Sequence, residues 1–457
     1  MFYWTGHPFV DAGLIALLLI SKKNSPEELT EKDIEKVIDF SSKLYARKEW
    51  SSGYIHAMML PNSGILMANP SMTKRRTPKA IAENLKALLN EPGDKNAPIC
   101  EICGRRHSRS KSVYRSDFPL VGTGGVPNYF PSAKDGLNVC SHCLFLVQFL
   151  PLVAYKVGGR VLVIHTYPYE LMLKLHHEAI NDVRKNFLAS NARDFKRPEN
   201  FLFRLLGELT RKTKRDDLWA NASITLYHFV NNNQGQDLQI IHVPTPVLRF
   251  IARANSKDPN GWKRIVAMGW RKQPSEEEFE KYERSYANEV YARLLAEESI
   301  LPYFIDMKNR RANAKWSLLS FYCSEVLGLD KKTLEFIKEV GDRIVQTLEN
   351  LPDNQLSRRV RELERAEKLY QFEAFFVNLE KLRQRLGIEK PLMTFDEFAM
   401  VLTSYGEDLN VSWRTVKNLL LFRVYERLHD RLMKASEEAE EVEEDEEVEI
   451  FGMGVEE

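Results

Sequence analysis

The sequence lacks an apolar run long enough to cross a membrane and lacks the usual phosphate-binding loops. Its most hydrophobic stretches are LIALLLI near the amino end and LFLVQFLPLVAY around residue 150. Both are shorter than the roughly 20 residues that span a bilayer. No basic leader precedes the first stretch, so we expect a cytoplasmic protein without a signal peptide. The chain has no G-x-x-x-x-G-K-[ST], and its GTGG has no strand and helix around it, which argues against a nucleotide-binding fold.

Motifs for metal-dependent hydrolysis are also missing. His176, His177 and Glu178 are adjacent, but consecutive residues point to different faces of a helix, and H-E-x-x-H does not occur. His429 and Asp430 have no second acidic cluster with which to complete a two-metal site. We expect both groups to lie on ordinary helix surface. We therefore predict that the protein is not an enzyme. A zinc-ribbon nuclease remains a competing interpretation.

The chain has little net charge, but its charge is unevenly distributed. Residues 437–457 contain twelve Asp and Glu and no Lys or Arg, and the whole chain has a net charge of +1. Residues 1–436 therefore carry an excess of thirteen positive charges. Blocks of like charge are usually solvated and disordered, so we expect a disordered acidic tail. The alternative is a tail that mimics a polyanion and shields a basic groove.

The hydrophobic pattern predicts an α+β chain. Residues 1–273 are expected to form a mixed α/β domain with a zinc ribbon inserted at 98–145. One helix is expected to begin at Pro8 with His7 as its cap, and a second to begin with Thr30 and Asp33 as a capping box. Strands are expected over GGRVLVIHTY, SITLYHFV and LQIIHVPT, with NNNQGQD as the turn of a hairpin between the last two. Residues 274–436 show apolar side chains every three or four residues and predict a helical bundle. Two stripes carry that prediction, Val360, Leu363, Ala366, Tyr370, Ala374 and Val377 in one and Val416, Leu420, Val424 and Leu428 in the other.

Four of the five cysteines form two C-x2-C pairs, Cys100 with Cys103 and Cys140 with Cys143, separated by thirty-six residues. Thiols stay reduced in the cytoplasm, so close pairs indicate a metal more than a disulfide. Four thiolates are the ligands of a structural tetrahedral Zn²⁺ site. Two alternatives stay open, a redox dithiol and a site in which His107 or His142 replaces one thiolate. Cys323 stands alone in a helical stripe and is expected to be a buried thiol.

Clustered basic residues predict contact with nucleic-acid phosphates, because Lys and Arg displace the counterions that surround a polynucleotide. A solvated surface is the alternative for the group after the first cysteine pair and for the helix face. One group follows the first cysteine pair, a second precedes the ribbon, a third is KNRRANAK, and a fourth shares one face of a predicted helix. The candidates are Lys74, Arg75, Arg76, Arg105, Arg106, Arg109, Lys111, Lys308, Arg310, Arg311, Lys315, Arg358, Arg361, Arg365 and Lys368.

These features together resemble a known family. The opening TGHPFVDAGLIAL, the CEIC and CSHC pairs with NYFPSAKDGLNVC leading into the second, and the all-helical last third are similar to the large subunit of type I-B CRISPR Cascade complexes, Tneap subtype. The resemblance covers most of residues 1–436 but has no counterpart for the acidic tail. It implies a non-catalytic subunit that binds the 5′ handle of a guide RNA and contacts the Cascade backbone subunits.

The resemblance also implies recognition of the protospacer-adjacent motif in duplex DNA, help in opening that duplex, and recruitment of the CRISPR helicase-nuclease. The small-subunit-like bundle is made separately in some such systems, and Met307 is a possible internal start. Polar side chains on loops suit the reading of a short motif, so we expect base contacts from Asn128, Asn231, Asn232, Asn233 and Gln234. A nucleic-acid-binding scaffold outside CRISPR systems is the remaining alternative.

Overall fold

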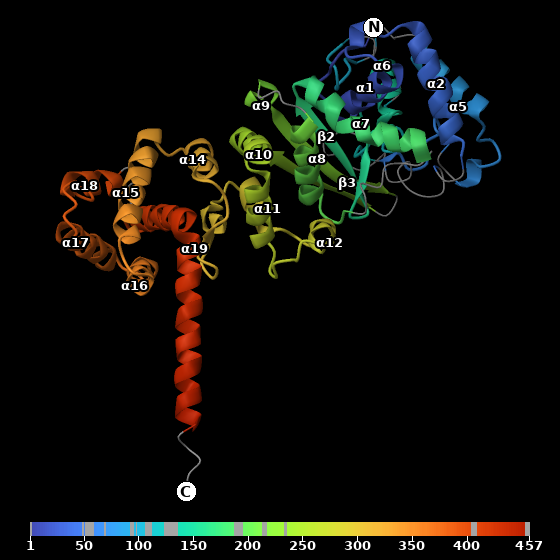
Figure 1. The fold of residues 1–457 in the computed structure, drawn as a ribbon. Coiled ribbons are helices and arrows are strands. Elements are labelled where there is room, and N and C mark those ends of the chain that lie inside the picture. The colour runs from blue at the N-terminus through green and yellow to red at the C-terminus, as the bar shows by residue number, and fades with distance from the viewer. Residues whose placement is uncertain are drawn as a thin grey trace. The chain divides into compact units, whose positions relative to one another are not determined.

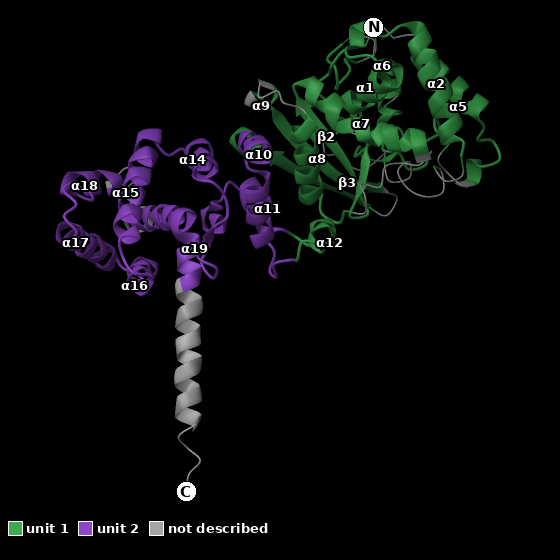
Figure 2. Ribbon diagram, viewed as in Figure 1, with its two compact units in different colours: residues 1–248, 275–287 green, residues 249–274, 288–457 purple. Residues whose placement is uncertain are grey.

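The computed structural model describes residues 2–47, 50, 59–67, 70–91, 96, 98–105, 112–122, 136–186, 195–212, 217–232, 235–403 and 409–452. The chain forms two compact units, one of residues 1–248 and 275–287 and the other of 249–274 and 288–457 (Figure 2). A search of the described helices finds none that is long and apolar enough to span a membrane.

The first unit begins with helices that the sequence predicts well. Helix α1 (Pro8–Ser21) starts at a proline, and α2 (Glu31–Tyr45) starts with a reciprocal capping box between Thr30 and Asp33, as expected. The other long helices of this unit are α5 (Pro78–Leu89), α7 (Tyr169–Asn186) and α8 (Pro198–Lys212), and the shorter helical elements are η1 (Pro26–Glu28), η2 (Pro70–Met72), α6 (Ser141–Val147), η3 (Leu150–Leu152), α9 (Asp217–Ala220) and α12 (Phe279–Ser285).

A four-stranded antiparallel sheet forms the centre of this unit, with strands in the order β1 (Tyr155–Val157), β2 (Arg160–Tyr167), β3 (Ser223–Asn232) and β4 (Gly235–Val243). The hairpin expected around NNNQGQD pairs Asn232 with Gly235. Strand β2 is buried along most of its length because α1 and α7 pack against it (Figure 1). The core of the unit therefore lies between the opening helices and the sheet.

The second unit is helical, as predicted, but its membership differs from the expected boundary at residue 273. It contains most of α10 (Thr245–Lys257), α11 (Pro259–Met268), α13 (Glu289–Leu295), η5 (Leu301–Phe304), the short β5 (Ile305–Asp306) and β6 (Arg311–Ala312), and α14 (Trp316–Glu325). Phe250 of α10 contacts Trp262, Phe304 and Tyr322. These aromatic contacts join residues 249–268 to the helical unit, whereas Asn200 of α8 bonds the carbonyls of Glu283 and Tyr286 and so binds α12 to the first unit.

The rest of the second unit is a bundle around α19 (Leu409–Gly452), which packs against α15 (Lys331–Glu349), α16 (Asp353–Glu364), α17 (Leu369–Arg385) and α18 (Phe395–Thr403) (Figure 1). Val416, Leu420, Val424 and Leu428 are all buried, which confirms the predicted stripe. Gly341 allows the close approach of α15 and α19, since an added Cβ would lie 2.8 Å from Cγ of Arg423.

The other predicted stripe is interrupted. Val360, Leu363 and Ala366 are buried, but Tyr370 and Val377 are 61% and 54% exposed. The reason is a break between α16 and α17, where Oε1 of Gln371 accepts hydrogen bonds from the amides of Glu367 and Lys368 and begins a new helix. The prediction of one continuous helix there is wrong, and α17 buries Phe372, Phe375, Phe376 and Leu379 instead.

The acidic segment follows the packed part of α19. The backbone of α19 is helical through Gly452, and the buried side chains of this helix lie between Trp413 and Leu432. Glutamate favours helix but repels its like-charged neighbours one turn away, and a helix without packing is marginal in water. The disorder expected from residue 437 onward stays a prediction.

Candidate metal centre

The two cysteine pairs meet at one point of the first unit. Cys100, Cys103, Cys140 and Cys143 place their Sγ atoms within 4.8 Å of one another, and the Sγ atoms of Cys103 and Cys140 are 3.8 Å apart. Four sulfurs that each lie about 2.3 Å from a tetrahedral Zn²⁺ are separated by about 3.8 Å from one another. The four thiols can therefore hold a metal ion, and they fit zinc.

Local backbone structure explains why the first pair forms a ligand turn. The amide of Gly104 donates to the carbonyl of Cys100 over 2.9 Å, and the amide of Cys100 donates to the carbonyl of Arg105 over 3.0 Å. Gly104 has a φ of +68°, a conformation that glycine adopts without the steric cost of a Cβ. The turn therefore directs both thiols of the C-x2-C pair inward.

The second pair sits at the beginning of a helix. Cys140 caps α6, whose first turn carries Cys143, and the amide of Cys143 lies 3.4 Å from Sγ of Cys140. The amide of Cys140 in turn lies 3.3 Å from Sγ of Cys100. Amide donors and the positive end of a helix both favour thiolate over thiol. This is the charge state that a metal requires of its cysteine ligands.

The two halves of the centre are also bonded to each other outside the cysteines. The amide of Glu101 donates to the carbonyl of Asn138 over 2.8 Å, and the amide of Asn138 donates to Oε2 of Glu101 over 2.7 Å. Val113 and Leu137 form an antiparallel bridge within the intervening segment. These contacts bring the two pairs together across a long sequence separation.

The alternatives for the cysteines can now be weighed. All five cysteines are free thiols, and four of them converge, which favours a metal over a single redox dithiol. His142 is not among the clustered ligands of the described chain; its ring meets that of Phe2 edge to face. His107 lies outside the described residues. Cys323 is buried, as predicted, and burial raises the pKa of its thiol to about 12.

Tyr3 belongs to the centre, and the motifs gave no sign of it. Burial raises the pKa of Tyr3, and a hydrogen bond with Cys103 adds to that rise. The guanidinium of Arg105 lies 3.2 Å from the centre of the Tyr3 ring. Arg105 is exposed, and the cation–π contact holds its guanidinium against Tyr3.

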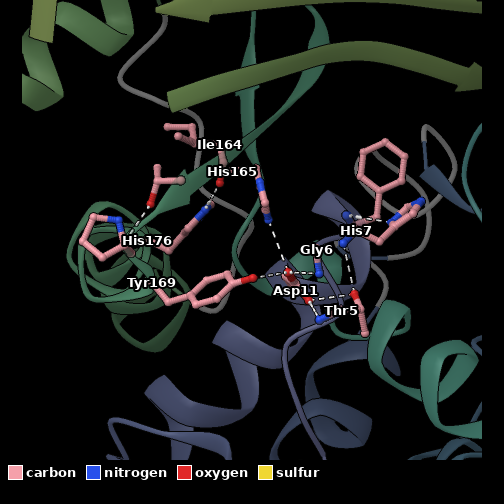
Figure 3. A network of polar contacts seen from close by, with 11 residues as sticks. Thr5, Gly6, His7, Asp11, Ile164, His165, Tyr169 and His176 are labelled. Carbon is pink, nitrogen blue, oxygen red and sulfur yellow. Dashed lines mark hydrogen bonds and ion pairs between the residues drawn. The ribbon is translucent and has the colours of Figure 1, made fainter. Parts of the chain in front are cut away.

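A second polar network begins two residues after Tyr3 and fixes the amino end of α1 (Figure 3). Asp11 is fully buried, and its carboxylate accepts hydrogen bonds from the amide and hydroxyl of Thr5, both 2.8 Å away, and from the amide of Gly6. Nε2 of His165 lies 3.3 Å from the same carboxylate, and Tyr169 donates to it.

The neighbouring histidines have structural partners. His7 caps α1 by accepting from the amide of Phe9, as predicted, and burial lowers the pKa of His7 to about 4 despite the attraction of Asp11. The ring nitrogens of His176 face the carbonyls of Val153 and Ile164 (Figure 3). The helix-surface interpretation of His176 is therefore wrong, since it is fully buried between η3 and β2.

Of the residues predicted to read bases, the structure describes the side chain of Asn231 alone. The side chain of Asn231 is buried, and its amide donates to the carbonyls of Met59 and Arg115 over 2.6 and 3.2 Å. Its Oδ1 accepts from Gln236. This placement contradicts the prediction that Asn231 is an exposed reader of bases. Asn128, Asn233 and Gln234 lie outside the described residues, and Asn232 is described only in its backbone, within β3.

Several of the predicted phosphate-binding residues have partners inside the protein. Arg76 is 9% exposed and donates toward the carbonyl of Met67. Arg310 bonds Ser357 and Glu364, and Arg311 pairs with Asp306 over 3.7 Å. These three guanidinium groups have partners inside the protein, and their contact with phosphate stays a prediction.

Other candidates remain open to solvent. Arg106, Arg109 and Lys111 lie outside the described residues. In the described parts of the chain, the exposed candidates with neither an ion pair nor a ring contact are Lys74, Arg75, Lys308, Lys315, Arg358, Arg361, Arg365 and Lys368. Arg358 and Arg361 lie three residues apart on α16, and Arg365 and Lys368 occupy the break before α17. This run of four cations is the longest exposed basic stretch that the sequence predicted and the structure describes.

A cluster of four cysteines that can hold a metal ion, within an α+β unit, is the class of site that this geometry defines. Residues 93–155, which contain all four cysteines, match the family described as CRISPR-associated protein (Cas_CXXC_CXXC). The match covers a small part of the 457-residue chain. No curated protein and no solved structure matches the chain.

Proposed function

We propose that this chain is a non-catalytic, nucleic-acid-binding subunit of an RNA-guided CRISPR complex, and specifically the large subunit of a type I-B Cascade. One observation carries the proposal: the segment similar to a CRISPR-associated family coincides with the four cysteines that converge. The family supports the CRISPR context, and the sequence resemblance supplies the finer assignment.

The proposed division of labour follows from how such complexes read their target. Base pairing with the guide RNA reads most of the sequence, so the protein contributes short-motif recognition and charge along the strands. In the proposal, the metal is Zn²⁺ and has a structural role, since all four ligands come from the protein. The exposed cations of α16 and the following break contact phosphates, which position strands without reading bases.

The non-catalytic part of the proposal is supported by the surroundings of the polar groups. The Asp11 and His165 pair is the closest arrangement to a catalytic dyad within the described residues. The hydroxyl of Thr5 already donates to Asp11, as do two backbone amides. These bonds fix the carboxylate at the start of α1, which supports a structural role for Asp11.

The test is to purify the tagged chain from its native host and to identify what accompanies it. We expect CRISPR guide RNA, Cascade backbone subunits and about one zinc ion per chain. Sequencing of the bound RNA and mass spectrometry of the partners measure the first two. A preparation with no guide RNA and no sister subunits would refute the CRISPR assignment, and metal-dependent DNA cleavage by the pure chain would revive the nuclease alternative.

A further inference from the structure

An open cavity of about 550 Å³ lies at the turn between β1 and β2, within the first unit. Its lining includes the turn glycines Gly158 and Gly159 and three basic residues, Lys156, Lys196 and Arg197. Acidic side chains are absent from the described lining. None of these residues belongs to the metal centre or to the basic groups that the sequence singled out.

The walls of this cavity are fixed by backbone contacts. The amide of Gly158 donates to the carbonyl of Phe195 over 2.9 Å, and the amide of Lys196 donates to the carbonyl of Arg284 over 2.8 Å. A Cβ added at Gly158 would lie 2.5 Å from the carbonyl oxygen of Lys196. Only glycine permits this approach, so the turn and the segment that carries the cations are held at a defined separation.

Two of the three cations that line the cavity have no carboxylate partner. Lys196 and Arg197 are exposed, and neither forms an ion pair with a carboxylate in the described structure. Arg197 directly precedes α8, so the amino end of a fifteen-residue helix lies beside the cavity. That end carries a partial positive charge, which adds to the attraction of the two side chains for an anion.

We propose that this cavity binds a phosphate group of a polynucleotide. Two unpaired cations, a helix amino end and a glycine turn that admits close backbone approach are the elements of an oxyanion site. The choice of a polynucleotide over another phosphate rests on the proposed function. The phosphate is either a terminal one or one of the internal phosphodiesters.

The test compares two double variants of the full-length chain. Lys196→Ala with Arg197→Ala removes both cavity cations, and Lys32→Ala with Lys36→Ala removes two exposed cations of α2 as a matched control. A fluorescently labelled single-stranded RNA, prepared with either a 5′-phosphate or a 5′-hydroxyl, is titrated at several salt concentrations. Fluorescence anisotropy gives each affinity and its salt dependence.

We expect the cavity variant to bind RNA about tenfold more weakly. Its slope of log affinity against log salt should shrink by about 0.7 for each phosphate contact that is lost. The control should match the wild type. A loss confined to the 5′-phosphorylated RNA identifies a terminal phosphate, and an equal loss with both RNAs identifies the backbone. Wild-type affinity and slope in the cavity variant would overturn the proposal.

A parallel titration with inorganic pyrophosphate separates this inference from the proposed function. If the wild-type chain binds RNA and the cavity variant binds it equally well, the cavity proposal is wrong and the proposed function stands. Wild-type chain that binds pyrophosphate at Lys196 and Arg197 but binds neither RNA nor DNA overturns both the polynucleotide ligand and the proposed function.

Discussion

Asp11 shows how a single residue can look catalytic and be structural. A buried carboxylate costs several kcal/mol unless it is fully bonded, and Asp11 obtains its bonds from Thr5, Gly6 and Tyr169. These bonds offset the cost of burying the carboxylate and fix the residue at which α1 begins. The sequence predicted the helix start and the role of His7, because both follow from local capping rules.

Replacing Asp11 with alanine leaves the amides of Thr5 and Gly6 without their acceptor. We expect the substitution to lower the free energy of unfolding by about 3 kcal/mol, measured by thermal or urea unfolding of the full chain. Asp39→Ala is the matched control, since the carboxylate of Asp39 is 63% exposed and pairs with an exposed Lys43. A surface pair of this kind contributes at most about 1 kcal/mol. Equal effects of the two substitutions would contradict the structural role of Asp11.

His7 gives a prediction for pH. Its pKa is lowered to about 4 by burial, whereas an unfolded histidine has a pKa of about 6.5. The unfolded chain therefore takes up a proton at a pH where the folded chain does not. The contribution of His7 to stability is constant above about pH 6.5, falls as the pH drops from there to about 4, and decreases by about 3 kcal/mol in total.

The substitution His7→Asn isolates this effect, because asparagine can accept the same capping hydrogen bond but does not titrate. We expect the difference in melting temperature between pH 7 and pH 5 to be smaller in the variant than in the wild type. Comparison with the wild type also removes the contribution of the cysteine ligands, which is common to both proteins. An identical pH dependence would show that His7 is not buried as described.

Asn231 marks the limit of residue-level prediction. The turn composition correctly predicted a hairpin, which is a local property of the chain. The acceptors of Asn231 are the carbonyls of Met59 and Arg115, far away in sequence. No local sequence pattern predicts such contacts. An Asn near a hairpin tip is therefore expected to be exposed, whereas tertiary packing buries Asn231.

At the scale of elements, the cysteine pairs were the most predictable feature. Their spacing specifies four ligands whatever the length of the intervening segment, because loop closure entropy grows only slowly with length. The four sulfurs converge as that spacing predicts and can hold a metal ion, and the identity of the ion stays a prediction. Tyr3 and the Glu101 to Asn138 contacts could not be predicted, since they depend on how the two turns approach each other.

Cys103→Ser tests the centre as a unit. We expect the metal content to fall from about one zinc ion per chain to near zero and the melting temperature to fall by about 10 °C or more, measured by elemental analysis and thermal unfolding. Cys323→Ser is the control, since Cys323 is buried in α14 and is not among the clustered ligands. That variant should keep its metal. Loss of zinc from both, or from neither, would contradict the assignment of the four ligands.

The cations of α16 give the second prediction at this scale. Arg358→Glu with Arg361→Glu reverses two exposed charges on one face of the helix. In the assembled complex, we expect weaker binding of target duplex and a salt slope that flattens by about 0.9 for each lost phosphate contact, measured by anisotropy or gel shift over a salt series.

The control for α16 reverses two exposed cations of α17, Lys381 and Arg385, which form no ion pair among the described residues. Both double variants change the net charge equally, so a shared long-range effect cancels. Equal binding by the two variants would show that the α16 face is solvated surface and does not contact phosphates.

At the scale of the whole molecule, fold class was easier to predict than domain membership. Strand and helix periodicities distinguish an α+β part from a helical part. They do not reveal that residues 249–274 join the helical unit while 275–287 return to the first. Aromatic contacts of Phe250 and the two hydrogen bonds of Asn200 decide this, and both are tertiary.

This interleaving bears on an internal start at Met307. Met307 follows β5, so a product that begins there lacks Phe250, Trp262 and Phe304 from the core of the helical unit. It also lacks Ile305, which pairs with Ala312 of β6. Phe304 is fully buried and contacts Tyr322 and Phe422, and loss of one buried aromatic side chain costs about 3–5 kcal/mol.

We therefore expect a chain of residues 307–457 to unfold at a lower temperature than a chain of residues 249–457. Each kcal/mol of lost stability lowers the melting temperature by about 2–4 °C, so the expected difference is more than about 10 °C. Circular dichroism measures both transitions, and binding of a hydrophobic dye reports the exposed core. Equal melting temperatures would show that the contacts of Phe250 and Phe304 are dispensable. A separately made bundle would then be as stable as the longer chain, whereas the expected result would mean that residues 307–457 alone lack part of the core that packs against Tyr322 and Phe422.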